Sequence, residues 1–288
     1  MIGIYHQDDL DGQCSAAIMK KAYPDIQLIG MSYGGAFPWD RVVNEEVIMC
    51  DFSLQPFDQM IRLVETCAKL TWIDHHTSAI SDYDAQIKTP WHGSRDTTKA
   101  ACWQAWDVLM NGHEIPFGVK LLAWYDSWDL DRNELVMPFQ MGMRSYDTRT
   151  IPSALWDLVL DPYSKSWIDT ICESGKSILR YQAVIDAEYV ASHGYDVTWQ
   201  GYRCRVMNRA RASSLAFQSM WNPNRYDMLV STVWNGRKWC VSLYSVKPEV
   251  DCGQIAKGMG GGGHCDAAGF TSPTLPKELR DAQEIETM

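Results

Sequence analysis

The stretch "IGIYHQDDLDGQ", residues 2–13, joins a short apolar run to a histidine and three carboxylates. His6, Asp8, Asp9 and Asp11 lie close together in a chain whose formal net charge is already −10. Such a group repels itself unless a positive charge lies among its side chains. The stretch therefore predicts a strand that ends at a metal site, for which the rest of the chain must supply further ligands.

The first third of the chain repeats this arrangement. Apolar runs that alternate with amphipathic segments predict strands at 2–6, 26–31, 46–50 and 70–74, with helices between them. This alternation is typical of a parallel sheet with helical crossovers. Ligands of such sheets bind at the carboxyl ends of the strands. We therefore expect convergence of the polar residues that follow three of these strands: His6 to Asp11, Asp51, and Asp74 to His76.

The remainder of the chain has two textures. Helical patterns cover residues 97–112, 116–130 and 164–192, and strand-like runs rich in β-branched and aromatic residues follow at 195–200, 202–208, 228–234 and 238–246. The predicted fold is α/β, with a parallel-sheet domain joined by a long helix to a smaller α/β domain with a mixed sheet. The expected parts are a catalytic domain (1–165), a helical linker (166–194), a substrate-binding domain (195–273) and a peripheral tail (274–288).

The composition of the chain indicates in which cellular compartment the protein is expected. No run of about 20 apolar residues exists, which argues against membrane insertion, and no basic segment precedes an apolar one at the N-terminus, which argues against secretion. The nine cysteines lack the paired spacing of a disulfide framework. We therefore expect a cytoplasmic protein in a reducing compartment.

Charge is distributed unevenly. Residues 196–273 carry nine Lys or Arg against five Asp or Glu, whereas the whole chain has a net charge of −10. The overall charge argues against wrapping of long nucleic acid, which depends on many phosphate contacts from basic residues. The pattern favours an acidic part that binds metal and a basic part that holds phosphate.

A centre of two metal ions needs a bridging carboxylate and further oxygen or imidazole ligands on each side. Ligands of mixed carboxylate and imidazole type, without thiolates, favour Mn²⁺ or a similar ion over structural zinc. The residues that meet this count are His6, Asp9, Asp11, Asp51, His75 and one later Asp.

The segment "GMGGGGHCDAAGF", residues 258–270, is a second signal. Consecutive glycines let the backbone approach a phosphate and offer N–H donors, and His264 adds a protonatable donor. The alternative is a flexible linker, but "AAGF" indicates a return to packed structure.

Together these motifs resemble the DHH phosphoesterase superfamily with its C-terminal DHH-associated domain. The resemblance rests on "HQDDLDG" (6–12), "CDFS" (50–53), "DHH" (74–76) and "GGGGHCDAAGF" (260–270), and it spans about residues 1–272. Within the superfamily, the size and the "DLDG" form are most similar to nanoRNase-type oligoribonucleases and cyclic-nucleotide phosphodiesterases.

The resemblance implies a ligand set for two divalent ions, Mn²⁺ being favoured. One ion takes His6, Asp9 and Asp51, and the other takes Asp11, His75, the shared Asp51 and a downstream Asp. Asp126 is preferred over Asp129 as the downstream ligand, because the family places this Asp before a small residue and a Trp near a helix end. Asp8 is a bystander on the family spacing.

Catalytic and substrate-binding roles follow from the same resemblance. Asp51 and His76 are the expected catalytic residues, with His76 touching the phosphate or assisting the leaving oxygen, while Asp74 orients the histidines. A terminal phosphate or nucleotide is expected on the C-terminal domain, at Gly261, Gly262, Gly263, His264, Arg209 and Arg211. Many relatives carry Arg in a "SLRS" strand where this chain has "SLYS" (242–245), so Tyr244 is expected to stack on a base instead.

The expected function is that of a Mn²⁺-dependent phosphodiesterase that hydrolyses short oligonucleotides or small nucleotide diesters to mononucleotides, with water activated by two metals. The alternatives are a phosphomonoesterase or anhydride hydrolase acting on 3′-phosphoadenosine 5′-phosphate or pyrophosphate, a single-strand exonuclease, and a nucleotide-binding sensor without turnover. The expected partner is a short oligonucleotide or small nucleotide, with neither a membrane nor long duplex nucleic acid. Assembly is left open, with a homodimer among the alternatives.

Overall fold

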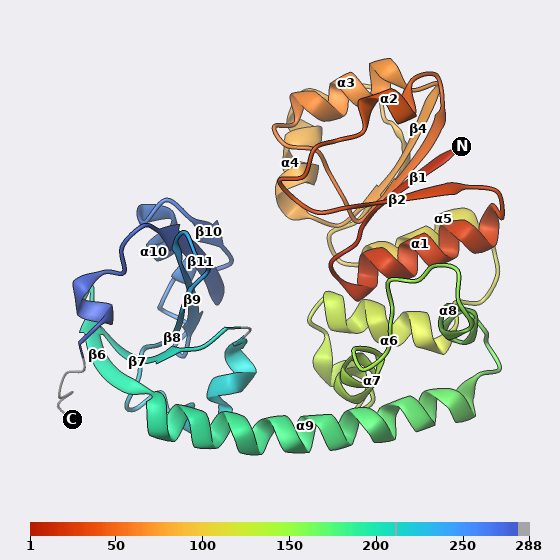
Figure 1. Cartoon of the computed structure of the whole chain (residues 1–288). Helices are drawn as coiled ribbons and strands as arrows, with labels where there is room; N and C mark the ends of the chain where they lie inside the picture. The colour runs from red at the N-terminus through yellow and green to blue at the C-terminus, as the bar shows by residue number, and fades with distance from the viewer. Residues whose placement is uncertain (211, 282–288) are drawn as a thin grey trace. The chain divides into compact units, whose positions relative to one another are not determined.

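The computed structural model describes residues 1–210 and 212–281. The chain divides after Leu179 into two compact units, which we call unit 1 (from residue 1) and unit 2 (from residue 180). The division falls inside the long helix α9 (Lys165–His193), which appears in green in Figure 1. This helix corresponds closely to the one expected at 164–192.

Unit 1 is built on a sheet whose strands are all parallel, in the order β2-β1-β3-β4-β5. The strands are β1 (Ile2–His6), β2 (Gln27–Met31), β3 (Glu46–Cys50), β4 (Lys69–Asp74) and β5 (His92–Arg95). The predicted parallel sheet is thereby confirmed. Because β1, β3 and β4 are direct neighbours, the polar residues that follow them leave the sheet at adjacent points along one edge.

Helices cover both faces of this sheet (Figure 1), with α2, α3 and α4 on one face and α1 and α5 on the other. Their bounds are α1 (Leu10–Ala22), α2 (Trp39–Val42), α3 (Asp58–Thr66), α4 (Thr77–Gln86) and α5 (Ala101–Leu109). Successive residues of β3 explain the two layers, since side chains alternate between the faces of a sheet. Val47 and Met49 belong to the core that includes Leu63 of α3, whereas Ile48 and Cys50 belong to the core that includes α1 and α5.

Three further helices extend the core of unit 1 that includes α1 and α5. They are α6 (Phe117–Asp126), α7 (Val136–Met143) and α8 (Ala154–Val159), and the one-turn helix η1 (Leu130–Arg132) lies between α6 and α7. Their buried residues Val119, Phe139 and Trp156 join the cluster that packs on α1. This layer holds α6, and with it Asp126, against the start of α1 and α5.

Two expected helices are shorter than their patterns indicate. The segment 97–100 forms a turn rather than helix, because the Asp96 carboxylate accepts hydrogen bonds from the Thr98 N–H (2.9 Å) and hydroxyl (2.6 Å). Similarly, α6 ends at Asp126, and Trp128 adopts a left-handed backbone conformation with φ of 57°. The strand β5 was not expected, since "HGSR" has no apolar alternation.

Unit 2 contains a mixed sheet in the order β10-β11-β9-β8-β7-β6. The strands are β6 (Tyr195–Trp199), β7 (Tyr202–Asn208), β8 (Met228–Trp234), β9 (Trp239–Ser245), β10 (Gly262–Gly263) and β11 (Ala267–Ser272). Strands β7 and β8 pair in parallel and the other neighbours are antiparallel, which confirms the predicted mixed sheet.

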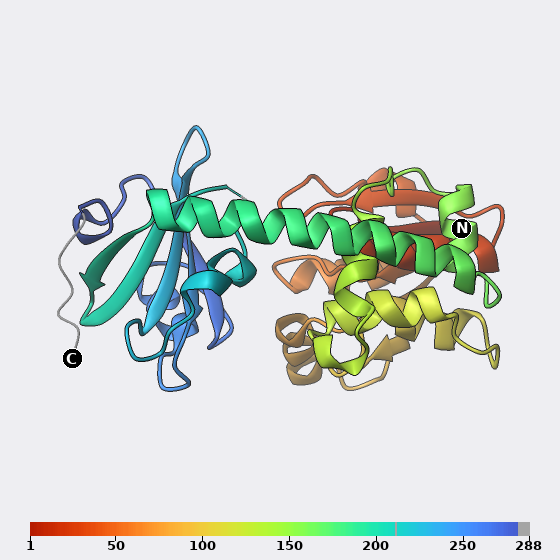
Figure 2. The ribbon, with the colours of Figure 1, turned by 90° about the horizontal axis from the view of Figure 1, so that it is seen from below.

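Helices cover both faces of the second sheet as well. Helix α10 (Cys252–Gly258) packs on one face through Cys252 and Ala256. The other face packs against Val190 of α9 and Phe217 of η2 (Ser214–Met220), and Figure 2 shows the strands behind the C-terminal half of α9. The short helix η3 (Lys277–Leu279) closes the edge beside β6, where the Tyr195 hydroxyl donates to the Leu279 carbonyl at 2.6 Å.

The basic residues of unit 2 are largely paired with acids of the same unit. Arg203 and Lys247 contact Asp227, Arg205 and Arg225 contact Asp196, and Arg209 contacts Asp186. Of the eight described basic residues between 196 and 273, five thus have an acidic partner within the fold. Among the described residues, no helix is both long and apolar enough to span a membrane.

Candidate metal centre

The first polar group is fixed where β1 turns into α1. His6 ends the strand, and Asp9 is the N-cap of α1, its carboxylate accepting the Gly12 N–H at 2.9 Å. Gly12 is required by space, because a Cβ there would lie 2.0 Å from the His6 carbonyl oxygen. The tight packing of α1 on the end of β1 therefore sets the positions of His6, Asp9 and Asp11 relative to one another.

Asp51 follows β3 in a left-handed conformation with φ of 55°, which is costly for a residue with a side chain. Its side chain is nearly inaccessible, with 1% of the residue exposed. Strain and burial of a carboxylate at one residue both oppose folding. A metal site at this position would account for both costs, because a bound cation requires the carboxylate as a ligand.

The third group is organised by Asp74 at the end of β4. The fully buried Asp74 accepts hydrogen bonds through Oδ1 from the N–H groups of His75 (2.7 Å) and His76 (3.1 Å). The same oxygen lies 2.6 Å from His76 Nδ1. One carboxylate thus orients both histidines, and His76 retains Nε2 as the ring nitrogen for other contacts.

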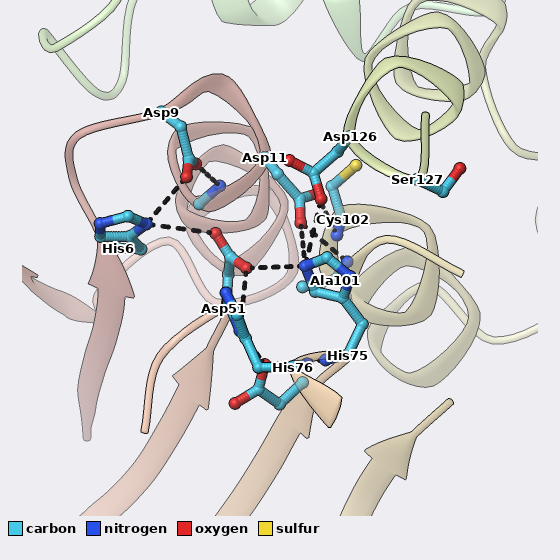
Figure 3. A network of polar contacts seen from close by, with 12 residues as sticks. His6, Asp9, Asp11, Asp51, His75, His76, Ala101, Cys102, Asp126 and Ser127 are labelled. Carbon is cyan, nitrogen blue, oxygen red and sulfur yellow. Dashed lines mark hydrogen bonds and ion pairs between the residues drawn. The ribbon is translucent and has the colours of Figure 1, made fainter. Parts of the chain in front are cut away.

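Together these residues form two adjacent clusters with Asp51 between them, as Figure 3 shows. Cluster 1 consists of His6, Asp9 and Asp51, and cluster 2 consists of Asp11, His75 and Asp126. A third group of potential ligands, Asp51, His75 and His76, has one residue in common with each of them. In each cluster, one potential ligand atom from every residue lies within 4.8 Å of the others. Asp51 lies between them, with Oδ2 3.8 Å from His6 Nδ1 and Oδ1 3.3 Å from His75 Nε2.

Some of these polar atoms are buried without a hydrogen bond. They include His6 Nδ1 and Asp51 Oδ2, although His6 Nδ1 lies only 2.8 Å from Asp9 Oδ2. Atoms that are close but not aligned for hydrogen bonding are expected when they point to a common centre. Buried polar atoms of this kind are rare in folded proteins unless a ligand, an ion or water completes them. Both atoms belong to cluster 1, so its residues fit a divalent cation. For cluster 2 the fit rests on its donor set, two carboxylates and an imidazole whose ligand atoms lie within 4.8 Å of one another.

The electrostatics of the histidines reflect the surrounding acids. Contacts with Asp51 and Asp9 raise the pKa of His6 from 6.5 to about 10. Burial alone would lower the pKa of His75, but contact with Asp51 and the charges of Asp11 and Asp126 outweigh it and raise that pKa to about 10. Without another cation, the imidazoles themselves supply the positive charge of the site.

Burial opposes ionisation of Asp9, but contacts with His6 and the Gly12 N–H lower its pKa overall. The other three carboxylates are perturbed in the opposite sense. Burial and the negative charge of Asp51 raise the pKa of Asp11 to about 7, and burial and the charge of Asp11 raise that of Asp126 to about 7. Burial also raises the pKa of Asp51. The site therefore carries more negative charge than its surroundings accommodate, which divalent cations would relieve.

Asp11 is additionally held by the backbone of α5. Its two oxygens accept hydrogen bonds from the N–H groups of Ala101 (2.8 Å) and Cys102 (2.7 Å), at the positive end of that helix. These donors could not be predicted from the sequence, because every residue except proline supplies a backbone N–H group. The only sequence signal is the turn-forming "RDTTK" (95–99) ahead of an apolar helix.

Gln104 is a second residue that the sequence analysis missed. Its buried Nε2 donates to the carbonyls of Asp74 (3.1 Å), Asp96 (2.9 Å) and Lys99 (2.7 Å). Its Oε1 accepts from the Ser94 hydroxyl (2.6 Å) and the Asp96 N–H (3.0 Å). One side chain thus joins the end of β4, the end of β5 and the loop before α5. A glutamine between Trp103 and Ala105, within the apolar first half of the helix, is the sequence signal for this role.

The structure distinguishes the two downstream candidates. Asp126, the last residue of α6, places Oδ2 3.1 Å from His75 Nε2. Asp129 contacts Arg132 instead, at 3.9 Å, and belongs to neither cluster. Asp8, expected to be a bystander, lies at the margin of cluster 1 with its carboxylate 3.8 Å from His6 Nε2.

The glycine segment in unit 2 is partly explained by packing. Gly262 and Gly263 form β10, and a Cβ on Gly261 would lie 2.1 Å from the Gly269 carbonyl oxygen. The Gly261 N–H donates to the Ala256 carbonyl at 2.8 Å, so it is already used. His264 is exposed, and its N–H donates to the Ala267 carbonyl at 2.8 Å.

The other expected substrate contacts of unit 2 have partners of their own. The Tyr244 hydroxyl donates to the Ala212 carbonyl at 2.8 Å and its ring packs near Phe217, an arrangement that a base-stacking ring would not need. Arg209 pairs with Asp186 and lies over the Tyr189 ring. Arg211 lies outside the described residues.

No family model matches the chain, and no curated protein matches it either. Solved structures do match, at low sequence identity. The DHH domain of a protein assigned to a family of ribosomal proteins is 12% identical with a TM-score of 0.57, covering 93% of this chain and 81% of that one. The pGpG-specific phosphodiesterase PggH from Vibrio cholerae is 14% identical with a TM-score of 0.54, covering 94% and 92%. The exonuclease RecJ bound to manganese is 14% identical with a TM-score of 0.50, covering 93% and 85%. With the motifs at the ends of β1, β3 and β4, these similarities show that the chain has the fold of DHH-domain proteins.

Proposed function

We propose that this chain is a phosphodiesterase that depends on two divalent cations, with Mn²⁺ favoured, and that it cleaves short oligonucleotides or small nucleotide diesters to mononucleotides. The observation that carries the proposal is the position of Asp51, which belongs to cluster 1 and places Oδ1 3.3 Å from His75 Nε2 of cluster 2. A carboxylate that serves two adjacent ligand groups is what a two-metal phosphoryl-transfer site requires. Among proteins with this fold, PggH is a phosphodiesterase and RecJ is an exonuclease that was observed with manganese.

Two cations, when bound, would lower the pKa of a water molecule and offset negative charge on the phosphoryl oxygens. His6, Asp9 and Asp51 would hold one of them, and Asp11, His75, Asp126 and the shared Asp51 would hold the other. Carboxylate oxygens and imidazole nitrogens without a thiolate suit Mn²⁺ and similar ions.

His76 has the position of a group that acts on the substrate. Its Nδ1 is held by Asp74, and about a third of its side chain is exposed (36%), so Nε2 is the nitrogen free to approach a bound phosphate. Burial opposes protonation of the ring, but contact with Asp74 and its charge raise the pKa of His76 overall. A protonated His76 would donate a hydrogen bond to a phosphoryl oxygen or to the leaving oxygen.

Asp74 itself would act through the histidines. Its carboxylate fixes the backbone of both and the ring of His76, and it lies too deep to reach a substrate. Such supporting carboxylates orient metal-binding histidines and strengthen them as ligands.

Product analysis tests the proposal. The Mn²⁺-loaded wild type and the Asp51→Asn variant are incubated with RNA and DNA of two to about twenty nucleotides, cyclic mononucleotides, 3′-phosphoadenosine 5′-phosphate and pyrophosphate. Asp129→Asn serves as the matched control, since Asp129 is an aspartate near the site that belongs to neither cluster.

We expect release of mononucleotides from the shortest oligomers or small diesters by the wild type and the control. Loss of the carboxylate shared by both metal positions should reduce the rate of Asp51→Asn by a factor of at least about 1,000. Turnover of the monoester or pyrophosphate alone would replace the proposal by a phosphomonoesterase or anhydride hydrolase. Binding without any turnover would favour a sensor.

A further inference from the structure

One aromatic side chain beside the candidate metal centre, that of Tyr33, has no role in the function proposed above. Tyr33 lies two residues beyond β2, in a turn closed by a hydrogen bond from the Gly35 N–H to the Ser32 carbonyl at 3.1 Å. Strand β2 pairs with β1 so that Met31 lies opposite His6. The sheet therefore delivers Tyr33 to the same edge as the two clusters.

Three rings surround Tyr33, each belonging to the centre or adjoining it. Its ring stacks on Phe52, the residue after Asp51, with centroids 4.8 Å apart and an interplanar angle of 29°. The His6 ring lies 5.3 Å away, and the His76 ring meets it edge-on at 6.2 Å. Tyr33 is thus next to a residue of cluster 1 and next to the histidine that we assign to the substrate.

Tyr33 combines restraint with exposure. Phe52 is buried at 3% exposure, whereas 49% of Tyr33 remains accessible. A tyrosine has few rotatable bonds, and stacking on Phe52 restricts them further. Tyr33 is therefore a restrained aromatic residue of which about half stays open to a ligand, beside a site for charged groups. Core packing accounts for Phe52 but not for the exposed half of Tyr33.

We infer that Tyr33 is a base-stacking residue that selects substrates with a nucleobase next to the phosphate held at the two clusters. Every nucleobase has a flat face that stacks on aromatic side chains, whereas pyrophosphate and sugar phosphates have none. Stacking of one base corresponds to about a 10-fold gain in affinity or more. The inference rests on the proposed function, because it assumes that a phosphate binds at the clusters, and it adds which substrate class that site prefers.

Two ligands that contain the same phosphorylated ribose, one with a base and one without, test the inference. We would measure equilibrium binding of adenosine 5′-monophosphate and ribose 5-phosphate to the full-length, Mn²⁺-loaded chain by calorimetry. The variants are Tyr33→Leu, which removes the ring, and Tyr33→Phe, which keeps it. Tyr163→Leu is the control, since Tyr163 is 90% exposed and belongs to neither cluster.

We expect the wild type to bind adenosine 5′-monophosphate about 10-fold more tightly than ribose 5-phosphate or better. Tyr33→Leu should abolish this preference without changing the affinity for ribose 5-phosphate, and Tyr33→Phe and Tyr163→Leu should retain it. The inference is overturned if Tyr33→Leu keeps the preference, if it weakens both ligands equally, or if Tyr33→Phe loses as much as Tyr33→Leu. If the protein cleaves no diester but its preference for a base depends on the Tyr33 ring, the proposed function is wrong and the inference holds. Diester cleavage with no effect of the ring would do the reverse.

Discussion

Replacement of Gln104 by methionine tests whether the edge of the sheet is held by a polar network. Methionine has a similar length but none of the five hydrogen bonds that Gln104 makes. Each buried polar group left without a partner costs about 1–3 kcal/mol. Only the bond to the Asp74 carbonyl is fully buried, and water can reach the other groups. We therefore expect Gln104→Met to lower the free energy of unfolding of unit 1 by about 3–4 kcal/mol.

The matched control is Gln140→Met. Gln140 is also a buried glutamine of unit 1, at 3% exposure, but its Oε1 has no hydrogen-bond partner among the described residues. Removing a buried amide whose oxygen is already unsatisfied should cost less, about 1 kcal/mol. Urea unfolding followed by tryptophan fluorescence compares the two variants, because Trp72 and Trp106 are buried in unit 1.

The Gln104→Met variant should also bind metal more weakly than the wild type. Gln104 connects the end of β4, which His75 and His76 follow, to the loop before α5. The first N–H groups of α5 donate to Asp11. Loss of such supporting contacts typically reduces metal affinity by about 10- to 100-fold. If Gln104→Met were as stable as Gln140→Met and bound Mn²⁺ like the wild type, the reasoning about this network would be wrong.

Three further predictions concern other parts of the chain. Burial opposes ionisation of Asp227, but its contacts with Arg203 and Lys247 outweigh burial and hold its pKa well below the ordinary value. Its stabilisation of unit 2 should therefore be complete above about pH 5 and fade gradually as the pH falls through the acid range. Urea titrations should show a deficit for Asp227→Asn of about 2–4 kcal/mol at pH 7 and a smaller but still measurable deficit at pH 3. Asp126→Asn should lower Mn²⁺ affinity about 10-fold or more, whereas Asp129→Asn should leave the calorimetric isotherm unchanged. Gly12→Ala should destabilise unit 1 by at least about 2 kcal/mol, because its Cβ would meet a backbone oxygen at 2.0 Å; Gly258→Ala, in open space, should change the thermal midpoint little.

The part of the fold that the sequence predicted best is the parallel sheet of unit 1. Its strands are short apolar runs separated by amphipathic helices, and such periodicity is a local property that residue type records directly. The polar groups after β1, β3 and β4 could be expected to converge for the same reason, since parallel strands end at a common edge. Strand β5 could not be found, because "HGSR" pairs with β4 through its backbone rather than through apolar side chains.

The site was predictable to the extent that it depends on side-chain type. His6, Asp51 and His75 could be proposed as ligands from position alone, and the structure brings them together. The N–H donors of Ala101 and Cys102 could not, because any residue supplies a backbone N–H group. Tyr33 was missed for a different reason: a tyrosine in a glycine-containing loop is ordinary until the tertiary structure places it beside His6.

In unit 2 the tertiary structure changes how the sequence signals are interpreted. The positive balance of residues 196–273 suggested a phosphate-holding surface, yet Asp196 and Asp227 engage four of the basic residues within the fold. Ion pairs between residues far apart in sequence are invisible to a count of charges. Binding of substrate by the glycine segment and His264 stays a prediction.

The most direct test of the central claim is the location of Mn²⁺ in crystals by anomalous diffraction. Two peaks about 3.5–4 Å apart are expected, one at cluster 1 and one at cluster 2, with an oxygen of Asp51 coordinating both ions. A single peak, or two peaks that Asp51 does not join, would contradict the account of this chain as a two-metal phosphodiesterase.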